Sequence, residues 1–106
     1  EFKDLEDIQK IKRPHIPKHT SHNGHLYYLL LNTKNLRDNF IEEMRLKGVH
    51  CVFHYIPLHS SKIGKKIGRI SGDMTVTDDV AYRLVRLPIW IGVDNNFVSK
   101  CVRHCL

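Results

Sequence analysis

An amphipathic segment between two apolar runs constrains the fold of this 106-residue chain more than any other feature. The runs at residues 25–31 and 49–55 have the composition of strands, and residues 35–47 between them carry apolar side chains at helical spacing. We expect Asn35 to cap the start of this helix and Gly48 to end it. A strand, a helix and a second strand in succession predict an α/β arrangement.

The spacing of apolar residues indicates which side chains share a face of the predicted helix and of the second predicted strand. In the helix, Leu36, Phe40 and Met44 share one face, which Ile41 widens, so that face should turn toward the core. The second strand should alternate between its two sides, because successive side chains in a strand point to opposite faces. One set is Val49, Cys51, Phe53 and Tyr55, and the other is His50, Val52 and His54.

The rest of the chain is predicted to complete a small sheet covered by helices. Residues 2–11 resemble the end of a helix that Pro14 and Pro17 would stop, and the glycine-rich, basic residues 60–74 indicate an exposed irregular loop. A second helix should start at Thr75 or Thr77, followed by a strand at residues 86–91 and a final helix capped by Asp94. The predicted fold class is therefore α/β, with the helices on one face of the sheet.

The net charge of +6 raises the question of an acidic partner. The cations gather near the start of the chain and in residues 60–74, but neither group has the interleaved aromatic side chains that stack on bases. We therefore expect no nucleic-acid site and interpret both groups as solvated basic loops. No apolar run approaches the length of a membrane span, so we also expect no membrane partner.

Three cysteines, Cys51, Cys101 and Cys105, are an odd number for a small disulfide scaffold. No CxxC or HxxxH pair accompanies them, so we predict no zinc site. Small buried thiols of this kind fit a reducing cytoplasm. The chain does not begin with Met, and we expect it to be part of a longer protein.

The side chains best placed for chemistry lie where the second strand ends. His54, Tyr55 and His59 surround Pro57 there, and functional groups in α/β proteins often lie at such strand ends. Histidine exchanges protons near neutral pH, and the tyrosine hydroxyl can bond a sugar or a phosphate. No nucleophile elbow or phosphate-binding glycine loop is present, so the residues alone predict a possible site but no reaction.

Four segments, taken in order, resemble the DegT/StrS family of PLP-dependent sugar aminotransferases. They are the His-Leu-Tyr start of the first strand at residues 25–27, the run His-Tyr-Ile-Pro-Leu-His at 54–59, the Leu-Pro strand at 84–89 and the acidic cap at 94–98. The resemblance covers residues 14–102. The apolar turn at 91–93 and the cysteines in the last helix depart from the family pattern.

This resemblance implies that residues 1–106 form one unit, the small C-terminal domain of a fold-type I PLP-dependent aminotransferase. The large domain that holds PLP, with its Schiff-base lysine, would lie upstream, so no residue here is assigned a catalytic or cofactor-binding role. The whole enzyme would be a homodimer that moves an amino group from glutamate to a 4-keto-6-deoxy nucleotide sugar for cell-surface polysaccharide. By motif position, Tyr55, His59 and His25 would contact the substrate.

Two other interpretations remain open at this point. The chain could be a stand-alone basic α/β module that binds an acidic partner, or a non-catalytic piece that only associates through an exposed apolar surface. The basic residues between 60 and 74 could likewise meet nucleotide phosphates or simply face solvent.

Overall fold

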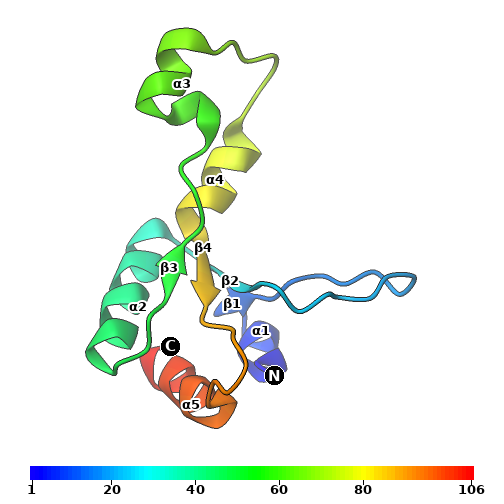
Figure 1. Cartoon of the computed structure of the whole chain (residues 1–106), viewed down its shortest axis with the longest axis vertical. Helices are drawn as coiled ribbons and strands as arrows, with labels where there is room; N and C mark the ends of the chain where they lie inside the picture. Colours follow the sequence, from blue (N-terminus) through cyan, green and yellow to red (C-terminus); the bar gives the residue numbers. More distant parts are fainter.

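The computed structural model describes residues 1–106, and its centre is a four-stranded antiparallel sheet (Figure 1). The strand order is β1-β2-β4-β3, so β3 forms one edge. The strands are β1 (Ile11–Lys12), β2 (Tyr27–Leu31), β3 (Val52–Phe53) and β4 (Leu84–Leu87). The helices are α1 (Lys3–Asp7), α2 (Lys34–Leu46), α3 (Lys62–Ile67), α4 (Thr75–Arg83) and α5 (Asn95–Cys105), with a 3₁₀ turn η1 (Leu58–Ser60).

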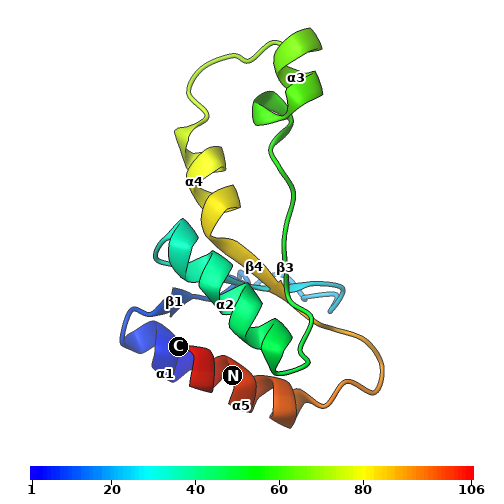
Figure 2. The same cartoon turned by 90° about the vertical axis from the view of Figure 1, so that its left-hand side faces the viewer.

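Helices α1, α2 and α5 lie on one side of the sheet, which confirms the predicted layer arrangement (Figure 2). In the central pair of strands, Leu29 lies opposite Val85, and neither side chain is exposed to solvent. Burial of such side chains supplies most of the stabilisation of a small domain. The buried apolar residues are Phe2, Leu5, Ile11, Leu29, Leu31, Phe40, Met44, Val49, Cys51, Val85, Leu87, Cys101 and Val102.

Helix α2 exists as predicted, but its start and its phase differ from the expectation. The cap is Thr33, whose hydroxyl accepts a hydrogen bond from the Leu36 amide at 3.2 Å, and not Asn35, which lies within the first turn. This places Arg37 on the buried face and leaves Leu36 half exposed. The predicted stop is confirmed, because Gly48 follows the helix with a φ of 78° that favours glycine.

All three predicted strands are shorter in the structure, and the first of them, β2, starts at Tyr27 instead of residue 25. Of residues 49–55 only Val52–Phe53 pair. Within one alternating set, Val49 and Cys51 are buried, whereas Phe53 and Tyr55 are exposed. The reason is that β3 has one neighbour, β4, which is itself only four residues long. The last strand is Leu84–Leu87 and not 86–91, since Pro88 has no amide hydrogen to continue the ladder.

Residues 56–83 project from the sheet and helix layer, and we call them the protrusion (Figures 1 and 2). It contains η1, then α3, where an irregular loop was expected, and α4, which starts at Thr75 with Met74 at the cap position. Ser61 makes α3 possible by capping it: its hydroxyl accepts from the Gly64 amide at 3.0 Å. The predicted exposure of this region is confirmed for most of its residues.

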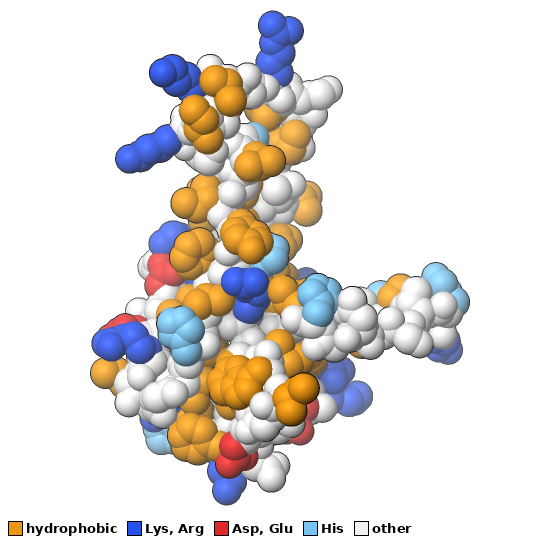
Figure 3. Space-filling view, in the orientation of Figure 1, with side chains coloured by type: hydrophobic (Ala, Val, Ile, Leu, Met, Phe, Trp, Pro, Cys, Tyr) orange, Lys and Arg blue, Asp and Glu red, His pale blue; other side chains and the backbone are white.

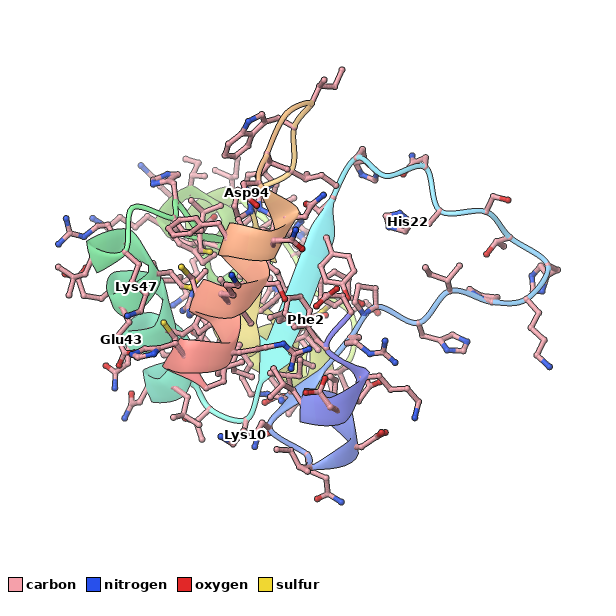
Figure 4. All side chains as sticks on the ribbon, turned by 90° about the horizontal axis from the view of Figure 1, so that it is seen from below. Phe2, Lys10, His22, Glu43, Lys47 and Asp94 are labelled. Carbon is pink, nitrogen blue, oxygen red and sulfur yellow. The ribbon has the colours of Figure 1, made fainter.

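The first and last helices of the chain pack against each other (Figure 4). Arg103 of α5 forms an ion pair with Asp4 of α1, and the Ser99 hydroxyl donates to Glu1 Oε1 at 2.7 Å. Helix α1 is shorter than the predicted helix at residues 2–11, because Gln9 has a left-handed φ of 59° and the chain then enters β1. Residues 13–26 form a long arm between β1 and β2 (Figure 1).

Asp94 caps α5 as predicted: its carboxylate accepts from the Phe97 amide at 2.9 Å. Cys101 and Val102 are buried as expected, whereas Phe97 is half exposed. No helix in the structure combines the length and the hydropathy that crossing a membrane requires.

Candidate functional site

Tyr55 lies just beyond β3, with two thirds of its side chain exposed. The His54 ring meets it edge-on, with 4.5 Å between the ring centroids. On the other side, the Arg86 guanidinium carbon is 5.5 Å from the centre of the Tyr55 ring, within the range of a cation–π contact. Arg86 reaches this position because it alternates with the buried Val85 and Leu87 on β4, and therefore projects from the face without helices.

An open groove of about 1090 Å³ separates the extended segment after β3 from α4. Hydrophobic side chains dominate its lining, and the space-filling view shows such side chains along the protrusion (Figure 3). A mainly apolar groove with a few polar groups is the usual form of a small-molecule site. The polar side chains in this lining belong to His54, Tyr55, Thr77 and Arg86.

His59 lies on η1, close to Tyr55 in sequence, but its side chain is engaged within the protrusion. Its Nε2 atom is 2.9 Å from Oδ1 of Asp78 on α4, and only 15% of the side chain is exposed. It does not line the groove. The structure therefore brings His54 and Tyr55 together at the groove. The His59 side chain instead links η1 to α4 through its bond with Asp78.

His25 lies on the arm, apart from the other two predicted binding residues. Its Nδ1 atom bonds the Asn23 side chain, and its ring stacks on that of His22 with 6.5 Å between centroids. Figure 4 shows His22 on the arm, away from the helices. His25 also lines neither of the two pockets that Tyr55 lines.

A second, smaller pocket of about 520 Å³ lies on the other side of Tyr55. It is formed by the first half of α2, the segment after β3 and the end of α4, and Lys65 of α3 reaches it. Within it the Arg37 guanidinium carbon is 5.6 Å from the centre of the Phe53 ring. Three cations and one carboxylate line this pocket: Lys34, Arg37, Lys65 and Asp38.

Arg37 and Arg86 were not among the residues predicted from the sequence. A signal for Arg37 was present, since residues 37, 40, 41 and 44 follow the i, i+3, i+4, i+7 spacing of one helix face better than residues 36, 40 and 44 do. We expected an apolar residue at that place. The signal for Arg86 was its position between Val85 and Leu87, which turn to the core.

The basic residues of the protrusion mostly face solvent. Lys62, Lys65 and Lys66 are exposed on α3, and Figure 3 shows cations at this end of the molecule. Of these three, only Lys65 lines either of the two pockets. No group of three or more His, Cys, Asp or Glu side chains is arranged to hold a metal ion.

Comparison with known proteins identifies relatives of the whole chain. Residues 2–105 match the DegT/DnrJ/EryC1/StrS aminotransferase family. The uncharacterized protein MJ1066 of Methanocaldococcus jannaschii is 35% identical over 91 residues, which are 82% of this chain and 24% of that protein.

Two solved structures show the same fold. A DegT/DnrJ/EryC1/StrS aminotransferase from Brucella abortus superposes with a TM-score of 0.77 at 20% identity, over 98% of this chain and 27% of that one. The PLP form of the protein Spr1654 from Streptococcus pneumoniae superposes with a TM-score of 0.71 at 21% identity, over 96% of this chain and 27% of that one. The chain thus spans about a quarter of the length of the proteins that it matches.

Proposed function

This chain belongs to the DegT/DnrJ/EryC1/StrS aminotransferase family, and we propose that it is the small C-terminal domain of a larger PLP-dependent sugar aminotransferase. The observation that carries the proposal is the match of nearly the whole chain to about a quarter of each relative. A larger partner domain is therefore implied. We propose that this partner is the PLP-binding domain of the same protein.

The residues of this chain do not fit PLP. An internal aldimine needs a lysine inside a pocket that also encloses the cofactor ring and supplies an acid for the ring nitrogen. Lys34 and Lys65, the two lysines at the smaller pocket beside Tyr55, are exposed, and the Lys34 ammonium is 2.5 Å from Oδ2 of Asp38. We therefore assign cofactor binding and catalysis to the partner domain and expect the isolated chain to be inactive.

For the whole enzyme we propose transfer of an amino group from glutamate to a 4-keto-6-deoxy nucleotide sugar. Residues 52–59 and 22–25 are most similar to the dTDP-4-amino-4,6-dideoxygalactose transaminases within the family, so we propose that subgroup and a role in cell-surface polysaccharide synthesis. A homodimer in the cytoplasm is the expected form of the enzyme.

We propose that Tyr55 and His59 contact sugar or phosphate oxygens of the substrate, with His25 behind them. Tyr55 supports this assignment best, because its hydroxyl-bearing ring is exposed between the groove and the smaller pocket. His59 is bonded to Asp78, so it would either position the segment around Tyr55 or present its other ring nitrogen to the substrate. His25 would have to act from the arm, which could approach the substrate only from outside the groove.

The test compares this chain with the full-length product of the same gene. Each is incubated with PLP, and the absorbance band of the internal aldimine is recorded, followed by an assay with glutamate and a 4-keto nucleotide sugar. We expect the band and the amino transfer only with the longer protein. A stable aldimine on this chain alone would contradict the assignment of PLP to the partner domain, and no aldimine on either would remove the aminotransferase proposal.

The role of Tyr55 is tested in the active full-length protein by Tyr55→Phe, which removes only the hydroxyl. Loss of one hydrogen bond to a bound sugar or phosphate should raise KM for the nucleotide sugar about tenfold and leave KM for glutamate unchanged. Tyr28→Phe is the control, because Tyr28 is a partly exposed tyrosine of β2 that lines neither pocket. Equal kinetics for Tyr55→Phe and the unmodified enzyme would exclude a substrate contact through this hydroxyl.

A further inference from the structure

Arg37 is a buried cation, and the Nε donor of its guanidinium group has no hydrogen-bond partner. Only 6% of the residue is exposed, yet its side chain forms no hydrogen bond, and its Nε atom is buried without a partner. The nearest acid is Asp38, with Oδ1 2.9 Å from Nε but at an angle that makes no hydrogen bond. A buried charge without such bonds is costly, so the arrangement indicates that a further group completes it.

Asp38 cannot compensate Arg37 fully, because it is shared. Its other carboxylate oxygen, Oδ2, is 2.5 Å from the Lys34 ammonium. With Lys65 at the rim, the pocket therefore has an excess of positive charge around a buried guanidinium. The Arg37 guanidinium also lies over the Phe53 ring, a contact that holds the group in one orientation without using its donors.

The space beside Arg37 suits a small ligand. The pocket has a volume of about 520 Å³, and the rings of Tyr55 and Tyr82 form part of its wall. Guanidinium groups bind carboxylate and phosphate oxygens through paired N–H donors, which explains why an arginine is used at a buried position. We propose that this pocket binds the oxyanion group of a small ligand, a phosphate or a carboxylate, through Arg37 and Lys65.

The experiment observes Arg37 directly, in the nitrogen-labelled 106-residue chain. The side-chain Nε–Hε resonances of its arginines are followed by NMR during titration with inorganic phosphate, and separately with acetate, at an ionic strength held constant with sodium chloride. We expect a saturable shift of the Arg37 resonance. Arg45 on the same helix is the internal control, because it is exposed and paired with Glu42, and its resonance should move little.

Variants distinguish binding of the anion at Arg37 from the non-specific attraction of anions to a chain of net charge +6. Arg37→Gln should abolish saturable phosphate binding, which is then followed through the amide resonances of neighbouring residues. An otherwise unchanged spectrum would show that the variant keeps the fold. Lys65→Gln, on the exposed side of α3, should weaken binding about two- to fivefold, the usual range for an exposed charge contact. Arg45→Gln is the matched charge control and should bind like the unmodified chain.

Tighter binding of phosphate than of acetate would assign the pocket to a phosphorylated ligand, and the reverse order to a carboxylate. The proposal is overturned if the Arg37 resonance moves no more than that of Arg45, or if Arg37→Gln binds as well as the unmodified chain. Neither readout uses PLP or amino transfer. Failure of this site would therefore leave the proposed aminotransferase function standing, and failure of that function would leave the site testable.

Discussion

Nε2 of His59 lies 2.9 Å from Oδ1 of Asp78, and this bond joins the 3₁₀ turn after β3 to helix α4. The two residues are 19 positions apart, and between them the chain passes through α3 and the glycine-containing loop of the protrusion. His59 therefore has a structural task within the protrusion, whether or not it also contacts a substrate. A loss of activity on its substitution would not by itself show substrate binding.

His59→Gln should loosen the protrusion without unfolding the sheet and its helices. Loss of a half-buried hydrogen bond costs about 0.5–1.5 kcal/mol, and amides near α3 and α4 should then exchange hydrogen about two- to tenfold faster. Asp78→Asn should give the same pattern, and the double variant should add little to either change, because both remove one bond. The measurement is hydrogen exchange by NMR. His50→Gln, on an exposed histidine outside the protrusion, is the control and should leave these rates unchanged.

The helix caps show how far sequence reasoning reached in this chain. Asp94 was identified correctly, although Asn95 and Asn96 after it are also residue types that cap helices. At α2 both Thr33 and Asn35 precede the pattern, and either residue type caps a helix. The choice depends on where β2 ends and the chain turns, which is a tertiary constraint. The phase of the helix was a separate error: Leu36 was taken for the buried face because it is apolar, and Arg37 occupies that face instead.

Thr33→Ala and Asn35→Ala should therefore have different effects on stability. Removal of the Thr33 hydroxyl leaves the Leu36 amide without its cap, so the free energy of unfolding should fall by about 1 kcal/mol. Asn35 lies inside the helix, where alanine is the better residue, so Asn35→Ala should be neutral or stabilise by a few tenths of a kcal/mol. Urea denaturation followed by circular dichroism measures both. A larger loss for Asn35→Ala would mean that the helix starts two residues later than the structure shows.

The candidate site was predictable only in part. Sequence patterns show where a residue lies along a helix or strand, but they do not show which residues of other elements lie next to it in space. The place of Tyr55 at the end of a strand followed from Pro57 and the motif around it, but its exposure to solvent did not. Its contact with Arg86 depends on the pairing of β3 with β4, which joins segments more than 30 residues apart. The separation of His25 from Tyr55 likewise depends on the path of the arm, which no local pattern determines.

The three thiols should differ in their reactivity. Burial raises the pKa of Cys51 to about 12, and the neighbouring thiols Cys105 and Cys101 add to this shift, so Cys51 should remain a protonated, unreactive thiol at pH 8. Burial also raises the pKa of Cys105, but this residue is only half buried. Iodoacetamide at pH 8 should therefore modify Cys105 first. Cys51 should react only as fast as the domain transiently unfolds and exposes it. Peptide mass spectrometry of timed samples measures the order, and faster labelling of Cys51 would contradict its burial.

The ion pair between Asp4 and Arg103 should make the packing of α1 on α5 sensitive to acid. A hydrogen bond from Arg103 lowers the pKa of the Asp4 carboxyl below its ordinary value of 3.8, and partial burial opposes this effect. Because the folded-state pKa is lowered, the stabilisation is fully present above the ordinary pKa and is lost as the pH falls through the folded-state pKa.

Asp4→Asn should accordingly reduce stability at pH 7 but have little effect near pH 2, so its stability should depend less on pH over that interval. The reciprocal variant, Arg103→Gln, removes the donor and should raise the Asp4 pKa back toward 3.8, as followed by the Asp4 carboxyl resonance in an NMR titration. It also removes the contact with Glu1, which helps to lower the Glu1 pKa, so the Glu1 resonance should shift in the same direction. An Asp4 pKa that is unchanged in Arg103→Gln would show that the first and last helices are not joined by this pair in solution.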